Sequence, residues 1–82
     1  MATFIPHASL AKLLGSRVIE TTATTVRDLM SEVESRVPPD EWKQMQHAAI
    51  LVNGVSIHQL KGLDTALDTK DKIWMVLPTG GG

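Results

Sequence analysis

The spacing of hydrophobic residues along this chain changes from region to region, and the clearest pattern lies between residues 25 and 37. The apolar positions of this stretch are Val26, Leu29, Met30, Val33 and Val37. Apolar residues at i, i+3, i+4 and i+7 form a stripe along one side of an α-helix. The pattern therefore predicts an amphipathic helix that is capped by Thr24 or Thr25 and ends before Pro38-Pro39.

The N-terminal region favours two strands around a short helical turn. Residues 2–7 (ATFIPH) and 16–22 (SRVIETT) have strand composition and predict a loose hairpin. Between them, SLAKLLG has leucines at helical spacing, with Ser9 as a cap and Gly15 as a stop. A single helical turn is expected there.

The C-terminal half favours three more strands. The run AAILVNGVSIHQL predicts two strands joined by a turn at Asn53-Gly54, because Asn-Gly between apolar runs is a strong hairpin signal. A last strand is predicted from Ile73 to Leu77. Residues 40–47, which precede the hairpin, suit a short helix or an ordered loop.

Five short strands and one long helix in this order predict an α+β fold of the β-grasp (ubiquitin-like) type. In this architecture a mixed five-stranded sheet wraps around the helix, and the last strand lies centrally beside the first. We expect residues 1–82 to form a single domain with a flexible tail at residues 79–82.

Side chains of the last strand should alternate between the two faces of the sheet. Ile73, Met75 and Leu77 are expected to face the helix, which leaves Trp74 and Val76 on the other side. A large aromatic residue beside a valine on a solvated face is typical of an interaction patch. The alternative is that residues 38–47 cover this pair.

Composition and charge exclude several function classes. Eight Lys and Arg residues against nine Asp and Glu residues give a net charge of −1, and no basic stripe is visible, so nucleic acid is not an expected partner. The sequence has neither an apolar run of membrane-spanning length nor a secretory signal, so we expect a cytoplasmic protein without membrane contact. The absence of cysteine excludes disulfides, thiolate metal sites and a cysteine nucleophile.

Other candidate chemistry is weak. The histidines lack the paired spacing of metal ligands, and no metal site is expected; they are His7, His47 and His58. Three aspartates resemble turn formers more than a calcium loop; they are Asp64, Asp68 and Asp71. No nucleophile-elbow pattern is present. Three methionines are interpreted as core filler rather than a methionine-rich binding groove; they are Met30, Met45 and Met75.

The sequence closes with LPTGGG, and stability does not explain this ending. Glycine has no side chain to bury and loses the most backbone entropy when it is ordered. One interpretation of Gly80-Gly81-Gly82 is a frayed, inert end. The other is that the terminal carboxylate is the reactive group, and that glycine keeps the tail slim enough to enter a partner's active site.

Taken in order, these segments resemble the MoaD/ThiS sulfur carriers, which are relatives of ubiquitin. The resemblance depends on SLAKLLG after the first strand, the helix at 25–37, VNG at 52–54 and LDTALDTKDKIWMVLPTGGG at 63–82. The length and Leu77-Pro78 look most like the small subunit of molybdopterin synthase. That subunit commonly has two prolines and two glycines, whereas this chain has Leu-Pro and three glycines.

The resemblance implies that an ATP-dependent, MoeB/ThiF-like enzyme adenylates the carboxylate of Gly82, which then becomes a thiocarboxylate that donates sulfur. The protein would be a substrate rather than a catalyst, would bind no cofactor itself, and would be a monomer when free. Its second partner would be the large subunit of a synthase or another acceptor enzyme. The implied partner-binding residues are Trp74, Val76, Pro78, Thr79, Gly80 and Gly81.

Three function classes remain open at this point: a sulfur carrier, a ubiquitin-like modifier joined to lysines, and a β-grasp interaction module with an inert tail. The first two use the same tail chemistry and differ in the partner that receives it. For a carrier, molybdopterin synthesis is the expected pathway, and thiamine, cysteine or tRNA thiolation are the alternatives.

Overall fold

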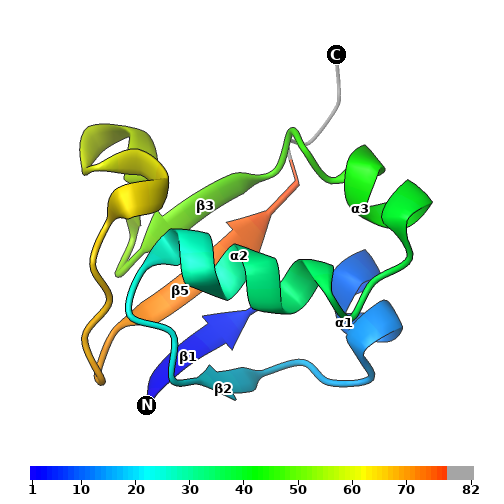
Figure 1. Cartoon of the computed structure of the whole chain (residues 1–82), viewed down its shortest axis with the longest axis horizontal. Coiled ribbons are helices and arrows are strands. Elements are labelled where there is room, and N and C mark those ends of the chain that lie inside the picture. Colours follow the sequence, from blue (N-terminus) through cyan, green and yellow to red (C-terminus); the bar gives the residue numbers. More distant parts are fainter. Residues whose placement is uncertain (78–82) are drawn as a thin grey trace.

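The computed structural model describes residues 1–77, which form a mixed five-stranded sheet with a helix lying across one face (Figure 1). The elements in chain order are β1 (Ala2–Ile5), α1 (Ala8–Leu14), β2 (Ile19–Thr21), α2 (Val26–Glu34), α3 (Pro39–Gln44), β3 (Ala49–Val52), β4 (Val55–Ser56), the 3₁₀-helices η1 (Ile57–Gln59) and η2 (Gly62–Asp64), and β5 (Lys72–Val76). The sheet order is β2-β1-β5-β3-β4. The last strand is therefore central, parallel to β1 and antiparallel to β3, and the predicted β-grasp fold is confirmed.

The long helix α2 uses its predicted stripe to cover the sheet. Thr25 caps it, since its hydroxyl oxygen accepts a hydrogen bond of 3.1 Å from the backbone N–H of Asp28. The helix ends at Glu34, three residues before the predicted end, and two tight turns then lead to the buried Val37. The Ser35 hydroxyl donates to the carbonyl of Glu32 at 2.7 Å, and such local side-chain bonds compete with helix continuation.

The N-terminal segment differs from its prediction in several details. β1 ends at Ile5 rather than at residue 7, and α1 has two turns rather than one. Its cap is His7 and not Ser9, because Nδ1 of His7 accepts a hydrogen bond of 3.2 Å from the N–H of Leu10. Gly15 ends the helix as predicted, with φ at +74° in the left-handed region that favours glycine.

The Asn53-Gly54 turn is confirmed. Both residues have positive φ, +51° and +86°, as a type I′ hairpin requires. The second strand of the hairpin is shorter than predicted, because the Ser56 hydroxyl caps η1 by accepting a bond from the N–H of His58. The polar stretch before the hairpin contains a short helix, α3, in agreement with one of the two expectations.

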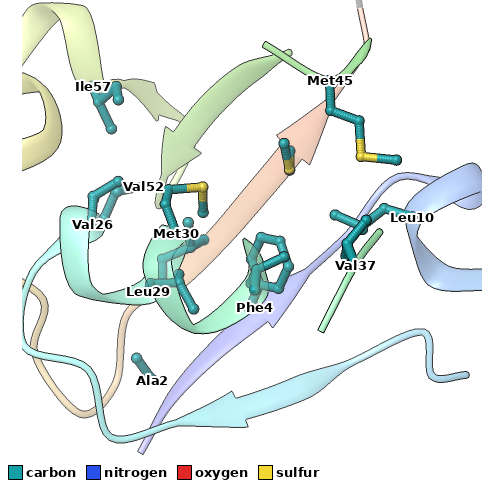
Figure 2. Close-up of a cluster of buried hydrophobic side chains, with 13 residues drawn as sticks. Ala2, Phe4, Leu10, Val26, Leu29, Met30, Val37, Met45, Val52 and Ile57 are labelled. Atoms are coloured by element: carbon teal, nitrogen blue, oxygen red, sulfur yellow. The ribbon is translucent and has the colours of Figure 1, made fainter. Parts of the chain in front are cut away.

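The hydrophobic core lies between α2 and the sheet (Figure 2). Phe4 of β1, Leu29 of α2 and Ile73 of β5 are completely buried there. At one end of the cluster, α1 and the segments after α2 and α3 each contribute one side chain; these are Leu10, Val37 and Met45. The core therefore occupies one face of the sheet, and no helix among residues 1–77 covers the opposite face.

Candidate functional site: the outer face of the sheet

The alternation predicted for the last strand is present in β5. Ile73 and Met75 are buried against α2, whereas Trp74 is 41% exposed and Val76 is 39% exposed. The prediction was wrong for Leu77, because the strand ends at Val76 and Leu77 is exposed rather than packed under the helix. Beyond the last ladder position, the two-residue period no longer determines which way a side chain points.

Neighbouring strands extend the exposed pair into a larger apolar surface. In the sheet register, Trp74 lies opposite Ile5 of β1 on one side and Leu51 of β3 on the other. Val76 lies opposite Ala49 of β3. Residues directly opposite one another project from the same face. We call this set the outer patch: Ile5, Ala49, Leu51, Trp74 and Val76.

The other end of the same face is polar. Thr3 of β1 lies opposite Lys72 of β5 and Glu20 of β2. The face thus changes from charged to apolar along the direction of β5, and the apolar end is the one from which the chain leaves the sheet. An aromatic residue at the centre of an apolar patch with polar surroundings is the usual composition of a protein-binding surface.

The alternative in which residues 38–47 cover the exposed pair is wrong. Met45 is buried in the core, and Trp42 packs against the same cluster. Because that core lies on the face that α2 covers, this segment is on the opposite side of the sheet from Trp74. The outer patch therefore has no covering element among residues 1–77.

The remaining predicted site residues lie outside the described residues. These are the partner-binding residues Pro78, Thr79, Gly80 and Gly81 and the reactive Gly82. Of the predicted site, the structure thus places Trp74 and Val76, and it adds Ile5, Ala49 and Leu51. The sequence did not single out these three residues, because their position on the outer face depends on the pairing of distant strands.

The aspartates between residues 64 and 71 bond to other groups of the protein. Within residues 1–77, no three histidine or acidic side chains converge as a metal site would require. Asp71 connects two turns. Its carboxylate accepts a hydrogen bond from the side chain of Asn53 at 2.9 Å and another from the N–H of Asp68 at 2.8 Å. Asp64 pairs with Arg27 of α2 at 3.1 Å. Asp68 and Asp71 flank a turn, as predicted, in which the N–H of Asp71 donates to the carbonyl of Asp68 at 3.1 Å, whereas Asp64 is the last residue of η2.

His7 has an unusual environment for a surface loop. Its Nδ1 atom accepts the cap bond, and its Nε2 atom is buried without a hydrogen-bond partner among the described residues. Burial lowers the pKa of His7 below its ordinary value, because the charged ring would lose its hydration. Because Nδ1 accepts the cap bond, this atom carries no proton in the folded structure.

The three methionines are buried, as predicted, and they also line a hollow that the sequence did not indicate. Met30, Met45 and Met75 contribute to the core, and together with Trp42 they border a depression of about 490 Å³ on the helix side of the sheet. Flexible thioether side chains fill irregular spaces of this kind.

The longest helix among residues 1–77 is α2, with nine residues, and none of the described helices has the length and apolar composition of a membrane span.

Comparison with known proteins places the chain among small ubiquitin-like proteins. Residues 7–82 match the family model described as ThiS family. Among curated proteins, no sequence is similar enough to this chain to count as a match.

Similar solved structures cover nearly the whole chain. Small archaeal modifier protein 1 (SAMP1) from Methanosarcina acetivorans is 22% identical with a TM-score of 0.82, over 99% of this chain and 95% of that one. The Amycolatopsis orientalis BexX/CysO complex contains a chain that is 19% identical with a TM-score of 0.82, over 100% of both chains. A putative molybdopterin converting factor, subunit 1, from Pyrococcus furiosus is 24% identical with a TM-score of 0.65, over 95% of this chain and 97% of that one.

Proposed function

The chain belongs to the ThiS family of ubiquitin-like sulfur carriers, and on that premise we propose that the carboxylate of Gly82 is the group that carries sulfur. The observation that supports this proposal is the position of the outer patch. The patch lies at the end of β5 from which the chain continues to Gly80-Gly81-Gly82. A partner that covers Trp74 and Val76 would therefore receive the glycines as well.

The proposed chemistry begins with activation, because a terminal carboxylate is ionised at neutral pH and is a poor electrophile. An oxygen of the Gly82 carboxylate attacks the α-phosphorus of ATP in an activating enzyme, and pyrophosphate leaves. The product is an acyl-adenylate. Hydrosulfide, or a donor whose sulfur has the same oxidation state, then attacks the acyl carbon. AMP leaves, and the product is the thiocarboxylate.

In this scheme the folded residues and the tail have different tasks. The outer patch supplies binding energy, because a partner that covers it removes apolar surface from water. Residues 79–82 would span about 13 Å if fully extended, enough to bring Gly82 into a pocket of the partner. ATP belongs to the activating enzyme, and the carrier itself binds no cofactor.

The acceptor pathway that we propose is molybdopterin synthesis, with the chain as the small subunit of the synthase. Leu77-Pro78 before the glycines supports this choice, and the similar Pyrococcus structure carries a molybdopterin converting factor name. A second candidate is a ubiquitin-like modifier joined to lysines, because another similar structure is named a modifier protein. Thiamine, cysteine and tRNA thiolation remain alternatives for the carrier.

The proposal is tested first by intact mass measurement of the protein purified from its own cells. A thiocarboxylate replaces one oxygen by sulfur, and fragmentation must locate this change at Gly82, because oxidation of a methionine adds nearly the same mass. A native C-terminus that does not end at Gly82, or one that is never adenylated by the activating enzyme of the same organism, would contradict the proposal.

A second experiment separates the two candidates. The thiocarboxylated protein is mixed in one reaction with the large synthase subunit and the pterin precursor, and in another with a cell extract and ATP. Conversion of the precursor to a dithiolene supports the carrier. Isopeptide bonds between Gly82 and lysines, with no precursor converted, support the modifier.

A further inference from the structure

A groove of about 730 Å³ lies beside the outer patch, where β1 leads into α1. Its apolar lining comes from the end of β1 and from one side of the helix; it consists of Ile5, Pro6, Ala8 and Ala11. Two exposed cations, Lys12 and Arg17, border the same groove. The groove therefore combines an apolar surface with a positive edge.

The two cations are available for a partner. The salt bridges among residues 1–77 use Arg27 and Arg36, and neither Lys12 nor Arg17 takes part in one. No acidic residue lines the groove. The groove is thus locally positive, although the whole chain carries a net charge of −1.

The groove is continuous with the outer patch. Ile5 belongs to both, because it lies opposite Trp74 in the sheet and also lines the groove. β1 and β5 are parallel, so their C-terminal ends lie at the same end of the sheet, with α1 close by (Figure 1). A protein that covers Trp74 and receives the chain after β5 is therefore positioned to cover the groove as well.

The groove is poorly suited to a small anion. The backbone N–H groups of Gly15 and Ser16 both donate to the carbonyl of Ala11, at 2.9 and 3.1 Å, and the Ser16 hydroxyl donates to Val18. The donors of the Gly15–Ser16 turn are therefore not free to surround a phosphate. The positive charge comes only from two long, exposed side chains, which is the arrangement found at the rim of a protein interface.

We propose that this groove is a second part of the docking surface and takes an apolar segment of the activating enzyme whose carboxylates face Lys12 and Arg17. The inference rests on the proposed carrier function and adds to it the chemistry of the partner. Exposed ion pairs contribute little energy each, so the cations act mainly on the rate and selectivity of association and lose their effect in high salt. Burial of the apolar lining contributes binding free energy that salt does not weaken.

The test compares two double charge reversals. Lys12→Glu/Arg17→Glu changes the groove, and Lys61→Glu/Lys70→Glu changes the net charge equally at exposed sites outside the groove. Each variant is titrated calorimetrically into the ATP-dependent activating enzyme of the same organism at low and high salt. We expect the groove variant to bind about tenfold more weakly than the control variant at low salt, with the difference shrinking at high salt.

A third variant tests the apolar lining. Ala8→Trp fills the groove from the exposed first position of α1 without changing charge. Its binding should weaken to a similar extent at both salt concentrations, and an unchanged thermal midpoint shows that the fold is intact.

Several outcomes would overturn the inference. If the activating enzyme adenylates the wild type, and Val76→Lys weakens binding while both double reversals behave alike, the outer patch docks and the groove does not. If sedimentation shows a dimer that Lys12→Glu/Arg17→Glu dissociates, the groove's occupant is a second copy of the chain. If the wild type is not adenylated at all, the carrier function itself fails.

Discussion

Ile5 and Trp74 lie directly opposite each other, although they are separated by nearly the whole chain. The parallel pairing of β1 and β5 places both side chains on the face of the sheet opposite to α2. This one register connects the outer patch at the end of the last strand with the groove beside the first helix. The docking surface that we propose is consequently built from both ends of the described chain.

The two faces of β5 should respond differently to mutation, and Met75 tests the buried side. Met75→Ala should lower the free energy of unfolding by about 2–5 kcal/mol, because it leaves a cavity beneath α2. Urea denaturation measures this loss. Val76→Ala is the matched control on the exposed side and should change stability far less. Equal losses for the two variants would contradict the assignment of Met75 to the buried face and Val76 to the exposed face.

Trp74 tests the exposed side. Trp74→Ala should weaken binding to the activating enzyme by about 2 kcal/mol or more, as central tryptophans in interfaces commonly do, while the domain stays folded. Val76→Lys should act in the same direction, because its ammonium group would have to be desolvated against an apolar partner surface. Calorimetric titration measures binding, and thermal unfolding provides the control. If either change unfolds the domain, Trp74 and Val76 belong to the buried face, and the assignment of the two faces of β5 is wrong.

The glycine tail should be required for activation and not for stability. Deleting Gly81 and Gly82 should abolish ATP-dependent adenylation and leave the thermal midpoint nearly unchanged, because glycine has no side chain to pack. Pyrophosphate exchange measures adenylation. One extra residue after Gly82 should block activation in the same way, and a variant with such an extension that is still adenylated without cleavage would disprove the assignment of Gly82.

The pH dependence of stability should include a contribution from His7. Burial lowers the pKa of His7 in the folded state, and protonation of Nδ1 would also abolish the hydrogen bond that caps α1. Between the lowered folded pKa and the ordinary unfolded pKa, the unfolded chain binds more protons. The contribution of neutral His7 to the free energy of unfolding is therefore complete above the unfolded pKa, near neutral pH. It is lost as the pH falls to mildly acidic values, through the lowered pKa of the folded state.

The comparison with His7→Asn isolates this contribution. Asparagine can cap the helix but does not titrate. Chemical denaturation between neutral and mildly acidic pH should give a smaller loss of stability for His7→Asn than for the wild type. Parallel curves for the two proteins would show that the buried ring has no influence on acid stability.

Asn53 should stabilise the hairpin in two ways. Its side chain donates to Asp71 and accepts from the N–H of Lys72, both at 2.9 Å, and its backbone has a φ of +51°. Asn53→Ala should cost about 1–3 kcal/mol, because both hydrogen bonds are lost in a conformation that alanine disfavours. Asn53→Gly loses only the hydrogen bonds, so its smaller effect, measured by urea denaturation, separates the two contributions. Equal losses would show that the backbone conformation adds nothing.

The sequence by itself determined the elements whose information is local. The apolar stripe of α2, the Asn53-Gly54 turn and the alternation between Ile73 and Trp74 each depend on residues within a few positions of one another, and each is present in the structure. These patterns are reliable because helices repeat every 3.6 residues and strands every two. They were sufficient to predict the β-grasp order and the exposed pair Trp74 and Val76.

Only the tertiary structure decided the extent of the docking surface. Ile5 and Leu51 join Trp74 through strand registers that connect distant segments, and no local period specifies a register between strands so far apart. Local periodicity also failed at Leu77, because the strand ends at Val76 and Leu77 is exposed. It did not identify His7 as the cap in place of Ser9, because the cap depends on the Nδ1 atom of His7 reaching the N–H of Leu10. Local periodicity thus predicts which side chains share a face, and long-range pairing decides which of them meet.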